Sequence, residues 1–227
     1  ITIPFATLPD SLYMKADRYR VTFHRIATPR FTKDVDELRT WIMDIRQILS
    51  DNAIRDMLAE EDGKFIRAVR TACVGAEMVV PTSGVAQHEI ITGGISRNTL
   101  ADSLKTMPNT PFSLEPHVLL VNQITAKEFL KFTHNEAGGT MSEDILKNGW
   151  SSQKLFGKEL IVTIKKGLVP TNRMFQFADP KFIGKSFVLE DTTMYIKREA
   201  YFIEFFAYES IGGAIGHTGG LAISDFR

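Results

Sequence analysis

A long helical pattern of apolar residues is the feature that most restricts the fold of this chain. It runs from Asp34 to about residue 74 through Leu38, Trp41, Ile42, Ile45, Ile48, Leu49, Ile54, Met57, Leu58, Phe65, Ile66 and Val69. This spacing predicts an amphipathic helix, capped by Asp34 with Glu37 or by Thr32, and Gly63 is where it could break or bend. A continuous helix of this length spans about 60 Å, which is longer than a small domain is wide.

The segment before this helix, residues 1–33, does not have the pattern of a compact domain. Tyr19, Val21 and Phe23 alternate with polar residues, which predicts a strand with one apolar face that ends at Pro29. The basic residues of the segment outnumber the acidic ones, and they are Lys15, Arg18, Arg20, Arg25, Arg30 and Lys33. Such a ribbon is equally typical of an arm that lies on another subunit and of an edge hairpin with a solvated basic face.

Charge and composition exclude several classes of protein. The chain has 227 residues, of which 27 are basic and 27 acidic, so no global positive field is available to bind phosphate. Within this balance, nine acidic residues lie between Asp34 and Asp62, directly after the basic segment. A single cysteine excludes an internal disulfide and a thiolate metal cage, and no apolar run approaches the roughly 20 residues of a membrane span. The composition, 44% hydrophobic and 24% charged, is that of a globular protein.

The rest of the chain mixes strands and short helices. Short strands are predicted at 78–80 and at Ile90–Ile91, and helices over 99–107, from Thr125 with Glu128 as its capping-box partner, and over 142–147. The nearly continuous apolar run at 117–122 predicts a strand buried on both faces. Further strands are predicted at 160–164, 174–177, 187–189, 194–210 and 221–226, with Gly212-Gly213 as a tight turn or bulge.

No catalytic, cofactor-binding or metal-binding constellation is present in the sequence. The five histidines, His24, His88, His117, His134 and His217, have none of the spacings of a local metal pair. The glycine cluster at 212–220 has the wrong spacing for a dinucleotide fingerprint, no G-x-S-x-G motif exists, and Cys73 is expected to be buried and inert. The sequence therefore predicts a protein that is not an enzyme and has no cofactor.

Three passages of the carboxy-terminal half resemble the major capsid protein of tailed bacteriophages, whose fold is shared with encapsulin shells. They are VLLVNQITAKEFLKF, ending at Phe132, LFGKELIVTIKKGLVPTNRMFQFADP at 155–180, and YFIEFFAYESIGGAIGHTGGLAISDF at 201–226. The order of elements along nearly the whole chain is similar too. The family has an amino-terminal arm and an outgoing loop strand that are missing here, and the chain begins at Ile1, so we expect that a leading segment has been removed or precedes it.

The resemblance implies an α+β capsid fold with an extended loop, a long spine helix, a peripheral domain of long antiparallel strands and a central axial α/β domain. The implied division is an extended arm at 1–33, the spine helix and part of the peripheral domain at 34–116, the axial domain at 117–180, and peripheral strands with a return strand at 181–227. Intersubunit contacts are expected at Lys15, Arg18, Arg20, Arg25 and Arg30, and near the capsomer centre at Gly138 and Gly139. Some family members cross-link a loop lysine to a neighbour's asparagine, but Lys15 and Asn172 match no motif for this bond.

The implied function is that of a structural subunit. Copies would form pentamers and hexamers of an icosahedral shell around double-stranded DNA, assemble in the host cytoplasm and remain in the virion, without a membrane. Portal, scaffolding and decoration proteins are further candidate partners. Two alternatives stay open: an encapsulin-type compartment that holds protein cargo, and a small hydrolase in which His117 or His134 converges on a carboxylate.

Overall fold

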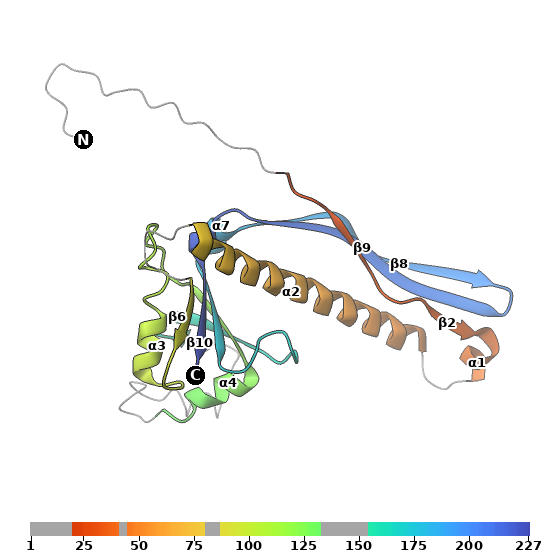
Figure 1. Cartoon of the computed structure of the whole chain (residues 1–227). Helices are drawn as coiled ribbons and strands as arrows, with labels where there is room; N and C mark the ends of the chain where they lie inside the picture. The colour runs from red at the N-terminus through yellow and green to blue at the C-terminus, as the bar shows by residue number, and fades with distance from the viewer. Residues whose placement is uncertain (1–19, 41–44, 80–86, 133–153) are drawn as a thin grey trace, which may run out of the picture.

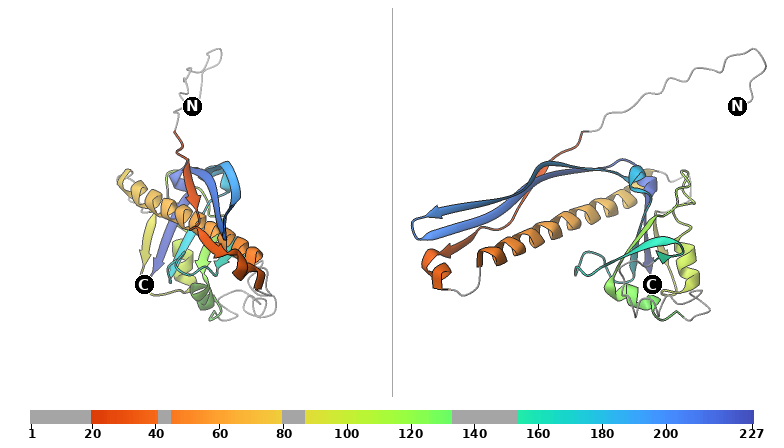
Figure 2. Two further views of the ribbon diagram at one scale, coloured as in Figure 1. Left: turned by 90° about the vertical axis from the view of Figure 1, so that its right-hand side faces the viewer. Right: turned by 180° about the vertical axis from the view of Figure 1, so that it is seen from behind.

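The computed structural model describes residues 20–40, 45–79, 87–132 and 154–227. The described chain has two parts, a compact sheet with helices on both faces and an elongated arm in which a long helix runs beside a long hairpin (Figure 1). Seen from behind and end-on, the arm projects from one end of the compact part (Figure 2). Among the described helices, none has both the length and the apolar character that a bilayer span requires.

The compact part is built on a mixed sheet of six strands in the order β3-β10-β7-β4-β6-β5. Their bounds are β3 (His88–Ile91), β4 (Val118–Asn122), β5 (Lys154–Leu155), β6 (Lys158–Thr163), β7 (Arg173–Phe177) and β10 (Leu221–Phe226). The short helices of this part are α3 (Arg97–Ser103), α4 (Gln123–Phe129), α7 (Pro180–Ile183) and the 3-10 turn η1 (Thr218–Gly220). Strands β3 and β10 pair into the same sheet as the strands of 117–180, so this one sheet contains residues from three of the four predicted segments. The predicted division into domains stays a prediction.

Helices cover both faces of this sheet, so its central strands are buried on both sides. Leu119 and Val121 of β4 pack against Leu100 of α3 and Phe129 of α4. Val118 and Leu120 of the same strand pack on the opposite face, in a cluster with residues of the long helix. The predicted doubly buried strand at 117–122 is therefore confirmed as β4.

The long helical pattern is confirmed as α1 (Val35–Thr40) and α2 (Ile45–Val79), and residues 41–44 between them lie outside the described residues. Helix α2 continues through Gly63, so of the two possibilities for this position the structure has the unbroken helix. The predicted strand at 78–80 is wrong for Met78 and Val79, which are helical, and Val80 lies outside the described residues.

Helix α2 joins the two parts because its two halves bury different sides. Ala53 and Met57 pack on Ala207 of the arm, whereas Val69 belongs to the core of the six-stranded sheet. Val69 follows Met57 by twelve positions, which at 3.6 residues per turn rotates its side chain by about 120°. The buried stripe thus changes side along the helix, and this explains how α2 persists through Gly63, whose cost of about 1 kcal/mol is offset by burial on both sides.

The arm contains a second sheet, in which β9 (Phe202–Ile215) is the central strand. On one edge β9 pairs with β8 (Gly184–Glu199), and on the other with β1 (His24–Ala27) and β2 (Phe31–Asp34), all antiparallel. Residues 20–23 are irregular, so the strand predicted around Tyr19–Phe23 begins instead at His24, while Tyr19 itself lies outside the described residues. The described part of the basic segment therefore forms edge strands on its own chain.

Two predictions for the last third of the chain are wrong. The single strand predicted over 194–210 is a hairpin, in which Glu199 pairs with Phe202 across a two-residue turn at Ala200-Tyr201. Gly212 and Gly213 form no turn or bulge of their own but lie inside β9, opposite Phe187 and Ser186. A residue other than glycine starts the turn: Ala200 has a φ of 50°, so the usual glycine signal for a hairpin is missing. The return strand predicted at 221–226 is confirmed as β10.

One predicted helix cap is confirmed, Asp34 at α1, and one is replaced, at α4. The Asn122 side chain accepts from the Thr125 N–H at 2.7 Å and starts α4, so Asn122 is the cap in place of Thr125. At α1, the Asp34 carboxylate accepts from the Asp36 N–H at 2.8 Å, and Thr32 lies within β2. The Asn122 cap places α4 directly after β4, the strand that it covers.

Candidate assembly surfaces

The sheet of the arm has one face on α2 and one face turned away from it. On β9, Ile203, Phe205 and Ala207 are buried, and Phe206 and Tyr208 alternate with them and are half-buried. Tyr195 of β8 joins this second face, with its ring centroid 4.9 Å from that of Phe206, which is itself 6.0 Å from that of Tyr208. We call Tyr195, Phe206 and Tyr208 the aromatic face.

Two of the predicted contact residues lie on the aromatic face. The guanidinium of Arg25 stands 5.3 Å from the centroid of the Tyr208 ring, and that of Arg30 stands 5.6 Å from the centroid of Phe206. Arg25 also approaches Glu190 of β8 at 3.8 Å. At exposed sites such cation–π contacts are worth about 0.5–1 kcal/mol. Arg25 and Arg30 therefore have partners within their own chain, and their role between subunits stays a prediction.

Of the other predicted contact residues, Arg20 is within the described part of the chain. Arg20 is exposed in the irregular segment before β1. Lys15, Arg18, Gly138 and Gly139 lie outside the described residues, as do residues 142–147, where a short helix was predicted.

The outer edge of β8 is a large surface that the sequence pattern did not indicate. Among the described strands, β8 pairs only with β9, and nearly all of its 16 residues are exposed. Large apolar side chains are among them: Leu189 is 68% exposed, and Phe187, Val188, Tyr195 and Ile196 are exposed too. A long edge strand of this kind is a ready template for pairing with another chain. We call residues Phe187–Ile196 the β8 edge.

Further exposed apolar side chains lie on α2, on β6 and on the connection that follows β6. Ile48, Ile54 and Leu58 of α2 are exposed, and so is Ile161 of β6. Ile164, in the connection between β6 and β7, is 80% exposed. Beside them, Lys165 bonds the Leu58 carbonyl at 3.3 Å and forms an ion pair with Asp62, which ties this connection to α2.

Two carboxyl groups meet where α2 packs on the arm. Glu209 of β9 is buried, accepts from the Thr192 hydroxyl at 3.0 Å through Oε2, and has no donor for Oε1 among the described residues. Burial and the neighbouring Glu209 carboxyl raise the pKa of Glu61 on α2, with a smaller contribution from Asp62. A proton held on Glu61 can therefore bond Glu209, and its loss places two like charges at the joint.

This pair predicts a pH dependence of stability that Glu61→Gln removes. Because the pKa of Glu61 is higher in the folded than in the unfolded state, the folded state keeps its proton longer, and the free energy of unfolding falls as pH rises above the unfolded pKa, near 4.3. An amide donates without charge, so Glu61→Gln should stabilise the protein by about 1 kcal/mol at pH 7. Urea unfolding at pH 4 and pH 7 measures this.

The adjacent, exposed Glu60 provides the matched control, since Glu60→Gln removes only a surface ion pair with Arg67. A gain of stability in both variants, or in neither, would contradict the assignment to the Glu61–Glu209 pair.

The histidines do not gather into a site within the described residues. His134 lies outside them, and the exposed His117 imidazole forms no hydrogen bond to a described carboxylate. His88 is the histidine that meets one: its Nε2 is 3.0 Å from Asp225, which also binds Arg173 through two nitrogens. No group of three or more His, Cys, Asp or Glu side chains in the described part of the chain could hold a metal ion. Cys73 is fully buried on α2.

Comparison with known proteins shows which fold the chain has. No protein-family model and no curated protein sequence matches the chain. Solved structures do: the virus-like particle from Pyrococcus furiosus has 20% sequence identity and a TM-score of 0.58, over 90% of this chain and 77% of that one. The structure titled Mycobacterium phage Bobi has 10% identity and a TM-score of 0.65, over 91% and 73%. The bacteriophage PhiM1 mature capsid has 9% identity and a TM-score of 0.56, over 100% and 79%. The chain therefore has the α+β fold of phage capsid proteins, which it shares with the Pyrococcus particle.

Proposed function

We propose that this protein is the major capsid subunit of a tailed phage, a structural protein without catalytic activity. Copies assemble into pentamers and hexamers of an icosahedral shell that encloses double-stranded DNA, and the shell forms in the host cytoplasm and becomes the virion capsid. The similarity of its fold to assembled particles over at least 90% of the chain supports this proposal. Portal, scaffolding and decoration proteins are the further partners that such a shell requires.

The single observation that carries the proposal is the β8 edge. A folded subunit whose 16-residue strand has no second partner among the described strands and exposes several large apolar side chains is poorly suited to a solitary state. The same holds for the exposed apolar side chains of α2 and for Ile164. Burial of such surfaces against other copies supplies stability that a single extended chain lacks.

The same fold also supports a second candidate, a compartment of the encapsulin type. The observation that favours it is that the Pyrococcus particle has 20% identity, against 10% for the Bobi phage structure. The two candidates differ in what the particle contains. Particles that carry protein cargo and no nucleic acid would indicate the compartment, and particles filled with DNA would indicate the capsid.

Replacement of Leu189 by glutamate is expected to block assembly without unfolding the subunit. Because Leu189 is 68% exposed in the single chain, its loss should change the melting temperature little. In the assembled state the same change removes about 1.5–3 kcal/mol of apolar burial per contact and adds an unpaired charge. Sedimentation velocity should show at least tenfold fewer particles.

Leu189→Met is the matched variant, since it keeps the apolar contact and should assemble as the wild type does. If Leu189→Glu forms particles at wild-type yield, the β8 edge is not an assembly contact.

A further inference from the structure

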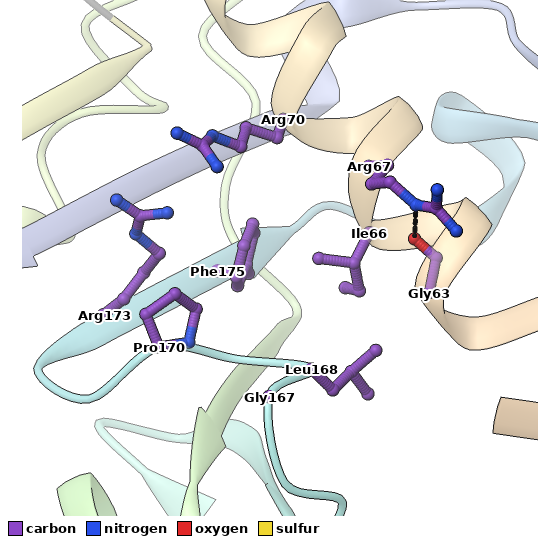
Figure 3. Close-up of a pocket in the computed structure, with 9 residues that line it drawn as sticks. All are labelled: Gly63, Ile66, Arg67, Arg70, Gly167, Leu168, Pro170, Arg173 and Phe175. Carbon is purple, nitrogen blue, oxygen red and sulfur yellow. Dashed lines mark hydrogen bonds between the residues drawn. The ribbon is translucent and has the colours of Figure 1, made fainter. Parts of the chain in front are cut away.

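A pocket lies at the joint between the arm and the compact part. It has a volume of about 250 Å³ and lies between the carboxy-terminal half of α2, the connection before β7, and β7 itself; its lining residues are Gly63, Ile66, Arg67, Arg70, Gly167, Leu168, Pro170, Arg173 and Phe175. Ile66, Leu168, Pro170 and Phe175 make the apolar part of this lining, and three arginines complete it (Figure 3).

The three guanidinium groups differ in what they already bind. Arg173 donates to Asp225 through Nε and through Nη2, the latter at 2.7 Å, which leaves its Nη1 donors unused by Asp225. Arg67 binds Glu60 at 3.0 Å and the Gly63 carbonyl at 3.1 Å. Arg70 is exposed and has no hydrogen bond or ion pair within the described residues. In Figure 3, Arg70 and Arg173 extend toward the same side of the pocket, away from Arg67.

The surroundings of the pocket carry a local surplus of positive charge. Glu60 pairs with Arg67, Asp62 with Lys165, and Asp225 with Arg173, while Glu61 of α2 meets the carboxyl of Glu209. Three more cations, Lys64, Arg70 and Lys166, have no ion pair in the part of the chain that the structure describes. This surplus stands out in a chain whose net charge is zero.

We propose that this arginine pocket binds backbone phosphates of the nucleic acid that the shell encloses, so that the α2 side of the subunit faces the interior. The inference rests on the proposed function and adds to it the surface that meets the nucleic acid. Arg70 and the free donors of Arg173 hold one phosphate over the pocket, because a planar guanidinium binds phosphate oxygens in pairs. Lys64 and Lys166 neutralise the phosphates on either side.

A continuous polyanion fits this arrangement better than a single carboxylate of a second copy. Lys64 and Arg70 lie six positions apart on α2, which separates them by about 9 Å along the helix axis. At about 3.4 Å per nucleotide of one strand, this length covers about three phosphates. A lone acidic side chain would neutralise Arg70 and leave Lys64 and Lys166 unpaired.

Binding of a 20-base-pair DNA duplex to the full chain tests the site, measured by fluorescence anisotropy between about 50 and 200 mM salt. Three phosphate contacts predict a slope of log affinity against log salt near −2.7, and Arg70→Gln or Lys166→Gln should each reduce its magnitude by about 0.9. Arg55→Gln is the matched control, because Arg55 is exposed on α2 about four turns earlier, among acidic residues, and should leave the slope unchanged. Equal slopes in all four proteins would overturn the proposal, and so would variants that weaken association between subunits but not DNA binding.

Orientation in the intact particle gives a second readout. A bulky thiol reagent should label Ala27→Cys, which is exposed on β1 opposite Tyr208, and should not reach Lys166→Cys until the particles are opened. The native Cys73 is fully buried and contributes little background. Equal labelling of both variants in closed particles contradicts an inward α2 side. Failure of the wild type to form particles at all instead refutes the proposed function, so the two failures are distinguishable.

Discussion

Replacement of Val69 by aspartate is expected to destabilise the subunit strongly. Val69 is fully buried on α2, in the core cluster with Phe175 and Ile223 of the six-stranded sheet. The described neighbours of Val69 in this cluster are apolar, so an aspartate there carries an uncompensated charge, which costs about 4 kcal/mol or more. For a chain of this size, that loss lowers the melting temperature by about 8–16 °C in thermal unfolding followed by circular dichroism.

The neighbouring residue supplies the control for this experiment. Ala68 is exposed, so Ala68→Asp introduces the same charge one position away and should change stability by no more than about 0.5 kcal/mol. The two halves of α2 bury different sides, and Val69 belongs to the half that holds the compact part. Loss of that contact should therefore also abolish particles, and equal melting temperatures for the two variants would contradict this description of α2.

Replacement of Arg173 by methionine is the second change with a large expected effect. Asp225 is buried at the end of β10 and receives Arg173 and His88. Burial raises the pKa of Asp225, but the hydrogen bonds from Arg173 and His88 outweigh it and lower the pKa below its ordinary value. Removal of Arg173 leaves a buried carboxylate with His88 alone, so Arg173→Met should cost about 3 kcal/mol at pH 7.

The pH dependence of this loss follows from the sign of the shift. A carboxyl with a lowered folded pKa contributes stability that is fully present above its unfolded pKa, near 3.9, and is lost as pH falls through the folded pKa. The wild type should therefore lose part of its advantage over Arg173→Met when unfolding is measured near pH 4 instead of pH 7. The double variant Arg173→Met with Asp225→Asn removes both charges and should recover much of the stability. A difference that stays constant with pH would exclude Asp225 as the cause.

The sequence predicted best those elements whose burial repeats with one clear period. Leu119 and Val121 alternate with Val118 and Leu120 in a strand covered on both faces, and the structure has β4 there. The helix from residue 34 onward was predictable from the helical spacing of its apolar residues, although Ile54 and Leu58 of that pattern are exposed. Its extension to Val79 was not, because the β-branched residues near its end favour a strand locally and are helical here.

The hairpin of the arm could not be read from its residues. Both faces of 194–210 mix charged and large apolar side chains, because β8 is exposed on nearly its whole length. The buried face of β9, with Ile203, Phe205 and Ala207, therefore does not stand out from the residues of β8 before it. The turn offers no glycine, and Ala200 takes the positive φ that usually signals one. Without a glycine at the turn, the sequence gives no position at which the long strand could be divided in two.

The candidate assembly surfaces were also predictable only where the signal lies in consecutive residues. The sequence placed Arg25 and Arg30 on a basic ribbon but did not predict Tyr208 and Phe206 as their partners, which are about 180 residues away in the chain. The arginine pocket was missed for a similar reason, since Arg70 and Arg173 are isolated cations in the sequence and meet only through tertiary packing. A cluster of positive charges that forms through tertiary packing can be recognised only once the fold is known, whereas a run of charges along the chain is visible in the sequence.

A cryo-electron microscopy reconstruction of the purified protein tests the central claim most directly. Closed shells with icosahedral symmetry, in which the β8 edge of each subunit lies against a neighbouring copy and α2 lines the inside, are the predicted result. A monodisperse monomer at high concentration, with the β8 edge free in solution, would contradict it.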